Sequence, residues 1–165
     1  MEDYVDKSPF HVTVGRMISD FSRSNSHEGG SLSKGDISSL RRMDPKEPCS
    51  VFWRMLASNK VEGCPENDRK WALVVKCMAI TYPNMDSQVN PGQSFRDAGF
   101  SQASDIKMSR LLKAEEGPFE DYLVSAIRQV SAKKVSINWM KFAEFVFFQN
   151  IKSKRNLAKD FYSNQ

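Results

Sequence analysis

Residues 65–82, PENDRKWALVVKCMAITY, carry a helical pattern that begins at a proline. Pro65 fits the first turn of a helix, because the N–H group that proline lacks has no partner in that turn. Apolar residues then recur at helical spacing, which predicts a face packed against a core. These residues are Trp71, Val74, Val75, Met78, Ala79 and Tyr82. The stretch YPNMDSQVNPG, residues 82–92, breaks the pattern and marks the best candidate boundary between two halves of the chain.

Helical spacing also dominates on both sides of this stretch, and no alternating strand pattern stands out. Further helices are predicted near residues 10–21, 37–43, 49–57, 105–114, 119–132, 139–148 and 151–162. Ser104 and Asn138 are candidate caps for two of them. The last helix has two predicted faces: Ile151, Ala158, Phe161 and Tyr162 on the inner one, and Lys152, Arg155 and Lys159 on the outer one.

These patterns predict an all-α fold, a compact bundle of about eight or nine short helices in two loosely defined halves. We expect one domain with three parts. Residues 1–36 hold an N-terminal helix and a flexible Ser- and Gly-rich loop, residues 37–90 an N-terminal helical half, and residues 91–165 a C-terminal basic helical half. The chain of 165 residues, 40% of them hydrophobic, is long enough to bury one core.

Cysteine usage and hydropathy indicate a compartment. Cys49, Cys64 and Cys77 are odd in number and lie in or beside predicted helices, which favours a reducing environment over a disulfide framework. No stretch approaches the ~18 apolar residues of a membrane-spanning helix. The N-terminal MEDYVDKSPF is acidic and unlike a secretion signal. We therefore expect a soluble, cytoplasmic protein with no membrane contact.

The positive charge is unevenly distributed along the chain. Its net charge is +4, and residues 1–99 carry 13 Lys and Arg against 13 Asp and Glu. Residues 100–165 carry 11 against 7, so the whole excess lies in the C-terminal part. A basic half of this kind suggests an acidic partner such as nucleic acid.

The sequence offers no constellation of catalytic or metal-ligating residues. No H-E-x-x-H, C-x-x-C, Walker or dinucleotide-binding glycine pattern occurs. Cys64 and Cys77 lie 13 residues apart without a second pair, so buried thiols are favoured over a zinc site. The acids of EEGPFED, residues 115–121, suit the start of a helix, where they face its dipole. We predict no enzyme activity, no metal and no cofactor, and keep an enzyme on a helical scaffold as the third alternative.

The basic residues are the remaining candidates for function. Polyanion binding is predicted for Arg41, Arg42, Arg69, Lys107, Arg110, Lys113, Arg128, Lys152, Lys154 and Arg155. An arginine fork binds phosphate through two parallel hydrogen bonds, while Lys107, Arg110 and Lys113 fall on neighbouring turns of one helix. Solvated helix surface is the alternative for any one of them. Arg42 has a further alternative, a buried ion pair with Asp44 or another acid, which would leave Arg41 as the more solvent-facing of the two.

The aromatic residues follow apolar stripes at helical spacing. We therefore expect them in the core rather than on platforms that stack nucleic-acid bases.

Several short pieces occur in a recognisable order: ISSLRRMDP, VFWRML, DRKWALVVKC, GQSFRDAGFS, SDIKMSRLLKA, AIRQVSAKKVSINW and KSKRNLAKDFY. Together they resemble the small subunit of the type I-E CRISPR Cascade complex, the CasB family. The resemblance runs from Ile37 to Tyr162. Lys107 stands where the family usually has arginine, and Phe147 and Phe148 stand where it often has tryptophan.

The resemblance implies a non-enzymatic, all-helical subunit in the antiviral defence of a prokaryote. Its partners would be the crRNA, the target and non-target DNA strands, the Cascade large and backbone subunits, and a second copy of itself. It would hold nucleic-acid backbone without reading sequence and so stabilise the R-loop and the displaced strand. The resemblance gives such roles to Arg41, Arg42, Arg69, Lys107, Arg128 and the cluster Lys152, Lys154 and Arg155. The alternative function is a helical adaptor that binds only other proteins.

Overall fold

The computed structural model describes residues 9–23, 32–61, 65–100 and 106–163, and within them the chain forms nine α-helices and no strand. The first four helices are α1 (Pro9–Ser22), α2 (Lys34–Arg42), α3 (Ser50–Ser58) and α4 (Pro65–Thr81). The other five are α5 (Pro91–Asp97), α6 (Ile106–Lys113), α7 (Glu116–Ala132), α8 (Trp139–Phe148) and α9 (Ile151–Tyr162). The predicted all-α class is confirmed, while the candidate cap Ser104 lies outside the described residues. The division of the chain at residue 90 stays a prediction.

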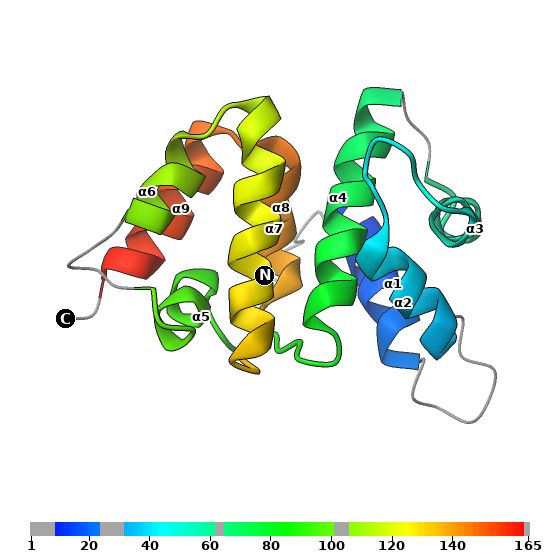
Figure 1. Cartoon of the computed structure of the whole chain (residues 1–165), viewed down its shortest axis with the longest axis horizontal. Helices are drawn as coiled ribbons and strands as arrows, with labels where there is room; N and C mark the ends of the chain where they lie inside the picture. The colour runs from blue at the N-terminus through cyan, green and yellow to red at the C-terminus, as the bar shows by residue number, and fades with distance from the viewer. Residues whose placement is uncertain (1–8, 24–31, 62–64, 101–105, 164–165) are drawn as a thin grey trace, which may run out of the picture.

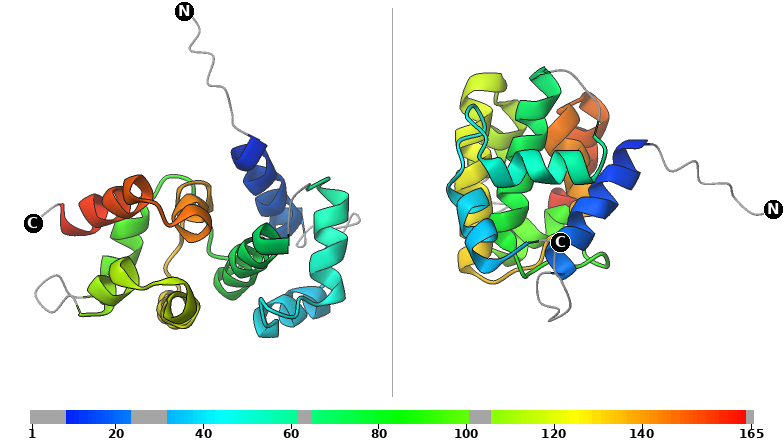
Figure 2. Two further views of the ribbon diagram at one scale, coloured as in Figure 1. Left: turned by 90° about the horizontal axis from the view of Figure 1, so that it is seen from above. Right: turned by 90° about the vertical axis from the view of Figure 1, so that its right-hand side faces the viewer.

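Helix α4 is the centre of the packing. It contacts α1 and α2 from the N-terminal part of the chain and α7 and α8 from the C-terminal part, as Figures 1 and 2 show. Every residue from Trp71 to Thr81 is buried as a result. The predicted apolar face is therefore only part of the buried surface, because residues between its members, such as Leu73 and Cys77, are covered by other helices.

The buried end of α4 needs hydrogen-bond partners, since the last carbonyl groups of a helix have none within it. The Ser131 hydroxyl on α7 donates to the Ile80 carbonyl at 2.8 Å. Thr81 donates from its own hydroxyl to carbonyls one turn earlier, and the same oxygen accepts a bond of 2.9 Å from Nε1 of Trp139. Side chains of α7 and α8 thus fix the position where α4 ends.

Polar side chains cap the starts of several helices. The Asn138 side chain accepts from the Lys141 N–H, so the predicted cap of α8 is confirmed. Ser33 and Asp36 form a reciprocal capping box at the start of α2. The hydrogen bond from the backbone N–H of Ser33 lowers the pKa of the Asp36 carboxyl. Burial acts in the opposite direction, and the Arg54 charge adds to the lowering. The capping box is thus strongest when Asp36 is ionised.

The inner face of α9 differs from the prediction. Its buried residues are Ser153, Leu157 and Phe161, spaced four apart, whereas Ile151 is 86% exposed. Tyr162, also predicted inside, is 38% exposed. The reason is rotational: the buried stripe of α9 passes through Leu157 and Phe161 and lies on a different side of the helix from Ile151. That stripe faces α5 and α8, which α9 contacts.

Helices α5 and α9 approach each other closely at Gly92. A Cβ atom at this position would lie 2.2 Å from the Phe161 backbone nitrogen and 2.4 Å from the Asp160 carbonyl carbon. Backbone atoms cannot rotate away as a side chain can, so any residue larger than glycine would force the two helices apart.

We expect Gly92→Ala to destabilise the fold by at least the ~1–3 kcal/mol typical of overpacking. Gly117→Ala on α7 is the matched control, because nothing lies within 4 Å of a Cβ atom there. Urea unfolding of the two variants measures the difference. Equal free energies of unfolding would show that α5 and α9 do not approach each other as described.

Candidate nucleic-acid interface

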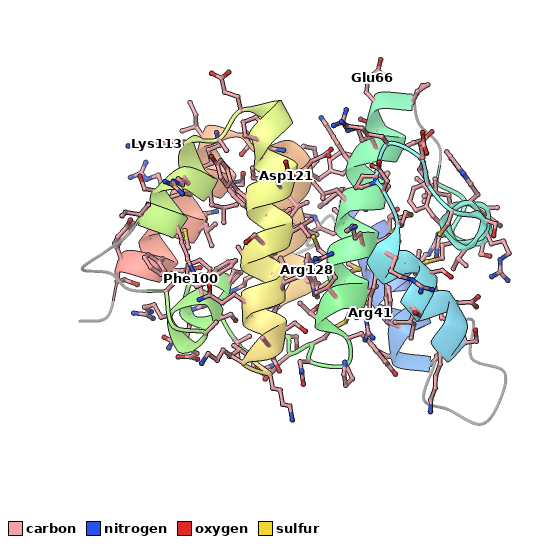
Figure 3. The ribbon with its side chains drawn as sticks, in the orientation of Figure 1. Arg41, Glu66, Phe100, Lys113, Asp121 and Arg128 are labelled. Atoms are coloured by element: carbon pink, nitrogen blue, oxygen red, sulfur yellow. The ribbon has the colours of Figure 1, made fainter. Side chains whose placement is uncertain are left out.

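A groove of about 580 Å³ lies between α4 and α7 and also borders the segment that joins α2 to α3. We call it the α7 groove. Its lining residues are Arg42, Met43, Asp44, Pro45, Lys46, Lys76, Glu120, Asp121, Val124, Ser125 and Arg128. Figure 3 shows Arg128 and Asp121 on the side of the molecule that faces the viewer, with Arg128 between α7 and α4. Two predicted site residues, Arg42 and Arg128, therefore meet in one groove although they lie 86 positions apart in the sequence.

Two further cations that the sequence analysis did not single out, Lys46 and Lys76, line the same groove. Lys76 belongs to the buried part of α4 and is only 8% exposed. Its Nζ donates to the Met43 carbonyl at 2.5 Å. The aliphatic stem can lie among apolar groups while the ammonium reaches the groove. A lone lysine inside WALVVKCMAI was the signal that could have identified it.

The acids of the groove are largely engaged by other groups. Glu120 Oε1 lies 2.6 Å from Nε of Arg69 in an ion pair. Asp44 Oδ1 accepts a bond of 2.9 Å from the Lys46 backbone N–H. The groove is mixed in charge, but its cations outnumber its acids, and two of its three carboxylates have partners.

Arg42 and Arg128 are exposed and form no ion pair or hydrogen bond with any residue that the structure describes. In particular, Arg42 does not pair with Asp44, so the structure does not support the buried ion pair considered for it. Both guanidinium groups can turn their donors toward a ligand.

Arg41 has a different environment from its neighbour. Its Nε donates to the Ala79 carbonyl at 2.6 Å, and its Nη2 donates to the Tyr82 carbonyl at 3.1 Å. These carbonyls lie at the C-terminal end of α4, where a positive charge also interacts favourably with the helix dipole. Arg41 thus fastens α2 to α4, and of the two arginines Arg42 has the less engaged guanidinium, the reverse of the expectation from sequence.

The basic residues of α6 lie on the other side of α7 from the groove. Figure 1 shows α7 between α6 and α4, and the left view of Figure 2 shows α6, α7 and α2 along one edge of the molecule. Lys107 Nζ donates to Gln129 Oε1 at 2.5 Å and lies 5.6 Å from the Phe100 ring centre. Lys107 therefore links α6 to α7, whereas Arg110 and Lys113 project into solvent.

The structure does not gather all ten predicted residues. Arg69 is paired with Glu120. Lys152, Lys154 and Arg155 belong to α9, which lies behind α6 in Figure 1 and apart from the α7 groove. Helices α2, α6 and α7, which carry Arg42, the α6 residues and Arg128, lie along one edge of the molecule in the left view of Figure 2. Nucleic-acid binding at all ten positions stays a prediction.

The described residues contain no group of three or more His, Cys, Asp or Glu side chains that could hold a metal ion. Burial raises the pKa of the Cys77 thiol to about 12, with Lys76 and Arg128 acting weakly in the opposite direction. Cys77 is therefore a protonated core residue at neutral pH rather than a nucleophile. Over the described part of the chain, no helix has the length and apolar character needed to cross a membrane.

The arrangement can bind a polyanion through charge without reading bases. Arg42, Lys46 and Arg128 present long cationic side chains around a groove whose described lining residues include no aromatic one. Such contacts suit phosphate groups spaced along a backbone, and their strength falls as salt rises.

A family model and two solved structures agree on what this chain is similar to. The family model for the CRISPR-associated protein Cse2 matches residues 36–162. A crystal structure of a Cse2-family CRISPR-associated protein from Thermus thermophilus is 14% identical, with a TM-score of 0.68. A crystal structure of CasB, also from Thermus thermophilus, is 13% identical, with a TM-score of 0.69. Each alignment covers 92% of this chain and 98% of the other, so the fold is shared over nearly the whole length. No curated protein matches.

Arg41 and Arg42 are adjacent but have different environments, so their substitution should change the stability of the fold by different amounts. We expect Arg41→Ala to lower the free energy of unfolding by about 1–2 kcal/mol, because the α4 carbonyls lose charged donors. Arg42→Ala should change it by less than ~0.5 kcal/mol, as for most surface substitutions. Thermal unfolding of both variants checks this, and equal destabilisation would contradict the distinct roles of the pair.

Proposed function

The chain belongs to the Cse2 family of CRISPR-associated proteins, and we propose that it is the small subunit of a type I-E Cascade complex that holds nucleic-acid backbone in the α7 groove. The observation that carries this proposal is the pair Arg42 and Arg128, which face one groove without partners among the described residues. The backbone contacts would be independent of sequence, since the lining offers charges and no aromatic surface to stack on.

The energetics of target recognition suit such a subunit. When a guide RNA invades a DNA duplex, the heteroduplex gained has about the same stability as the duplex lost. A few contacts to the backbone of either strand are then enough to shift the balance toward the open R-loop. A modest net charge of +4 fits a subunit held in place by neighbours, where the local concentration of nucleic acid is already high.

The proposed partners follow from this role. They are the crRNA, the target and non-target strands, the large and backbone subunits, and a second copy of the chain. The guanidinium groups of the α7 groove would contact phosphates. The protein would support binding and strand separation without performing a chemical step of its own.

We expect Arg128→Glu to weaken target binding by the assembled complex several-fold at low salt, to the same extent for every target sequence. Arg128→Ala should reduce the slope of log K against log salt concentration by about 1, because one phosphate contact is lost. Lys60→Glu is the matched control: Lys60 is exposed, undergoes the same charge change and is not a groove residue. Binding is measured by gel shift with R-loop formation read by permanganate footprinting.

Unchanged target binding in a correctly assembled Arg128→Glu complex would contradict the proposal. A loss of complex assembly with unchanged nucleic-acid affinity would instead favour a helical adaptor that binds only proteins. Circular dichroism of the isolated variants checks that Arg128→Glu and Lys60→Glu both keep the helical fold.

A further inference from the structure

A second hollow, of about 440 Å³, lies between α6 and the start of α7, and an exposed tyrosine, Tyr122, lines it. We call it the α6 shelf. Its lining residues are Ile106, Ser109, Arg110, Lys113, Ala114 and Tyr122. The shelf is separate from the α7 groove, since the two share no lining residue.

Tyr122 differs from the other exposed aromatic residues of the described chain. Those are Trp53, Phe148 and Tyr162, and each packs its ring against another aromatic ring. Tyr122 is 40% exposed and has no ring contact or hydrogen bond with any residue that the structure describes. Tyr122 lies three residues after the buried Phe119 and four before the buried Ala126, a spacing that also fits an apolar face, so the sequence pattern did not separate it from the core.

Two cations lie beside this ring. Arg110 and Lys113 are one turn apart on α6, about 5–6 Å between Cβ atoms for such a pair, and both are exposed without partners among the described residues. Lys107, which begins the same row, is instead held by Gln129. Asp121 lines the α7 groove and not the shelf, and none of the lining residues that the structure describes at the shelf is acidic.

An open aromatic face flanked by cations is what a single-stranded nucleic acid binds. The base of an unpaired nucleotide stacks on the ring while the neighbouring phosphates meet the charges. A duplex cannot bind in this way, because its base faces are covered by adjacent base pairs. An acidic peptide would use the charges but would leave the Tyr122 ring and the exposed Ile106 without a matching group.

We infer that the α6 shelf binds single-stranded nucleic acid, with one base stacked on Tyr122 and phosphates on Arg110 and Lys113. This inference rests on the proposed nucleic-acid role and deepens it by naming an unpaired strand as the ligand of a second site. The shelf and the α7 groove have different lining residues, and the helices α6 and α4 that border them flank α7 in Figure 1, so they could hold different segments of nucleic acid at once.

The experiment measures the affinity of the full chain for two fluorescent single strands. One is an oligothymidylate, and the other has the same sugar–phosphate backbone but abasic sites in place of its thymines. We expect the wild type to bind the oligothymidylate roughly five- to 150-fold more tightly than the abasic strand, the range for one stacked base. Tyr122→Ala should abolish this preference, and Tyr122→Phe should keep it. Trp53→Ala, which removes an exposed aromatic residue from α3, should also keep it. Arg110→Ala should weaken binding to both strands and lower the salt slope by about 1.

Equal affinity of the wild type for the two strands, or an unchanged preference in Tyr122→Ala, would overturn the inference. Undetectable binding of the oligothymidylate at low salt would also overturn it. If Tyr122→Ala has no effect on this preference while Arg128→Glu still impairs R-loop formation, the inference about the α6 shelf is wrong and the proposed function of the α7 groove stands. If both variants behave as the wild type, the proposed nucleic-acid role fails as well.

Discussion

The burial of α4 from Trp71 to Thr81 is the constraint on which the rest of the structure depends. A helix covered on several sides gains the packing energy of most of its side chains, but its terminal carbonyls lose access to water. Arg41 and Ser131 supply donors to those carbonyls from α2 and α7. The same two helices border the α7 groove, so the interactions that close the core also set the positions of the groove's walls.

Burial of α4 also links the core to the charged surface through Lys76. A buried ammonium without a hydrogen-bond partner would be costly, and that of Lys76 donates to the carbonyl of Met43, the first residue of the segment between α2 and α3. That segment carries Lys46 at the groove and follows directly after Arg42, the last residue of α2. The bond that satisfies the buried ammonium thus also holds this segment beside α4 and next to the exposed Arg128.

Sequence reasoning captured what depends on local spacing. The helices other than α5, the proline start of α4 and the Asn138 cap follow from periodicity and local hydrogen bonding, and they are confirmed. Helix α5 (Pro91–Asp97) was not predicted, because its seven residues are too few to show an apolar period. The contacts of Arg41 could not be predicted, because its partners at Ala79 and Tyr82 are distant in sequence. The orientation of Ile151 was wrong since the apolar pattern of α9 admits more than one inner face. Tyr122 was missed because its spacing of three from the buried Phe119 and four from the buried Ala126 also fits an apolar helix face.

The central claim is that the guanidinium groups of Arg42 and Arg128 in the α7 groove hold nucleic-acid phosphates. A cryo-electron microscopy structure of the assembled complex with its guide RNA and a bound DNA target tests this most directly. We expect backbone phosphates within hydrogen-bonding distance of Arg42 and Arg128. Density for an acidic protein segment in the groove, or a groove that holds only solvent while both strands pass elsewhere, would contradict the claim.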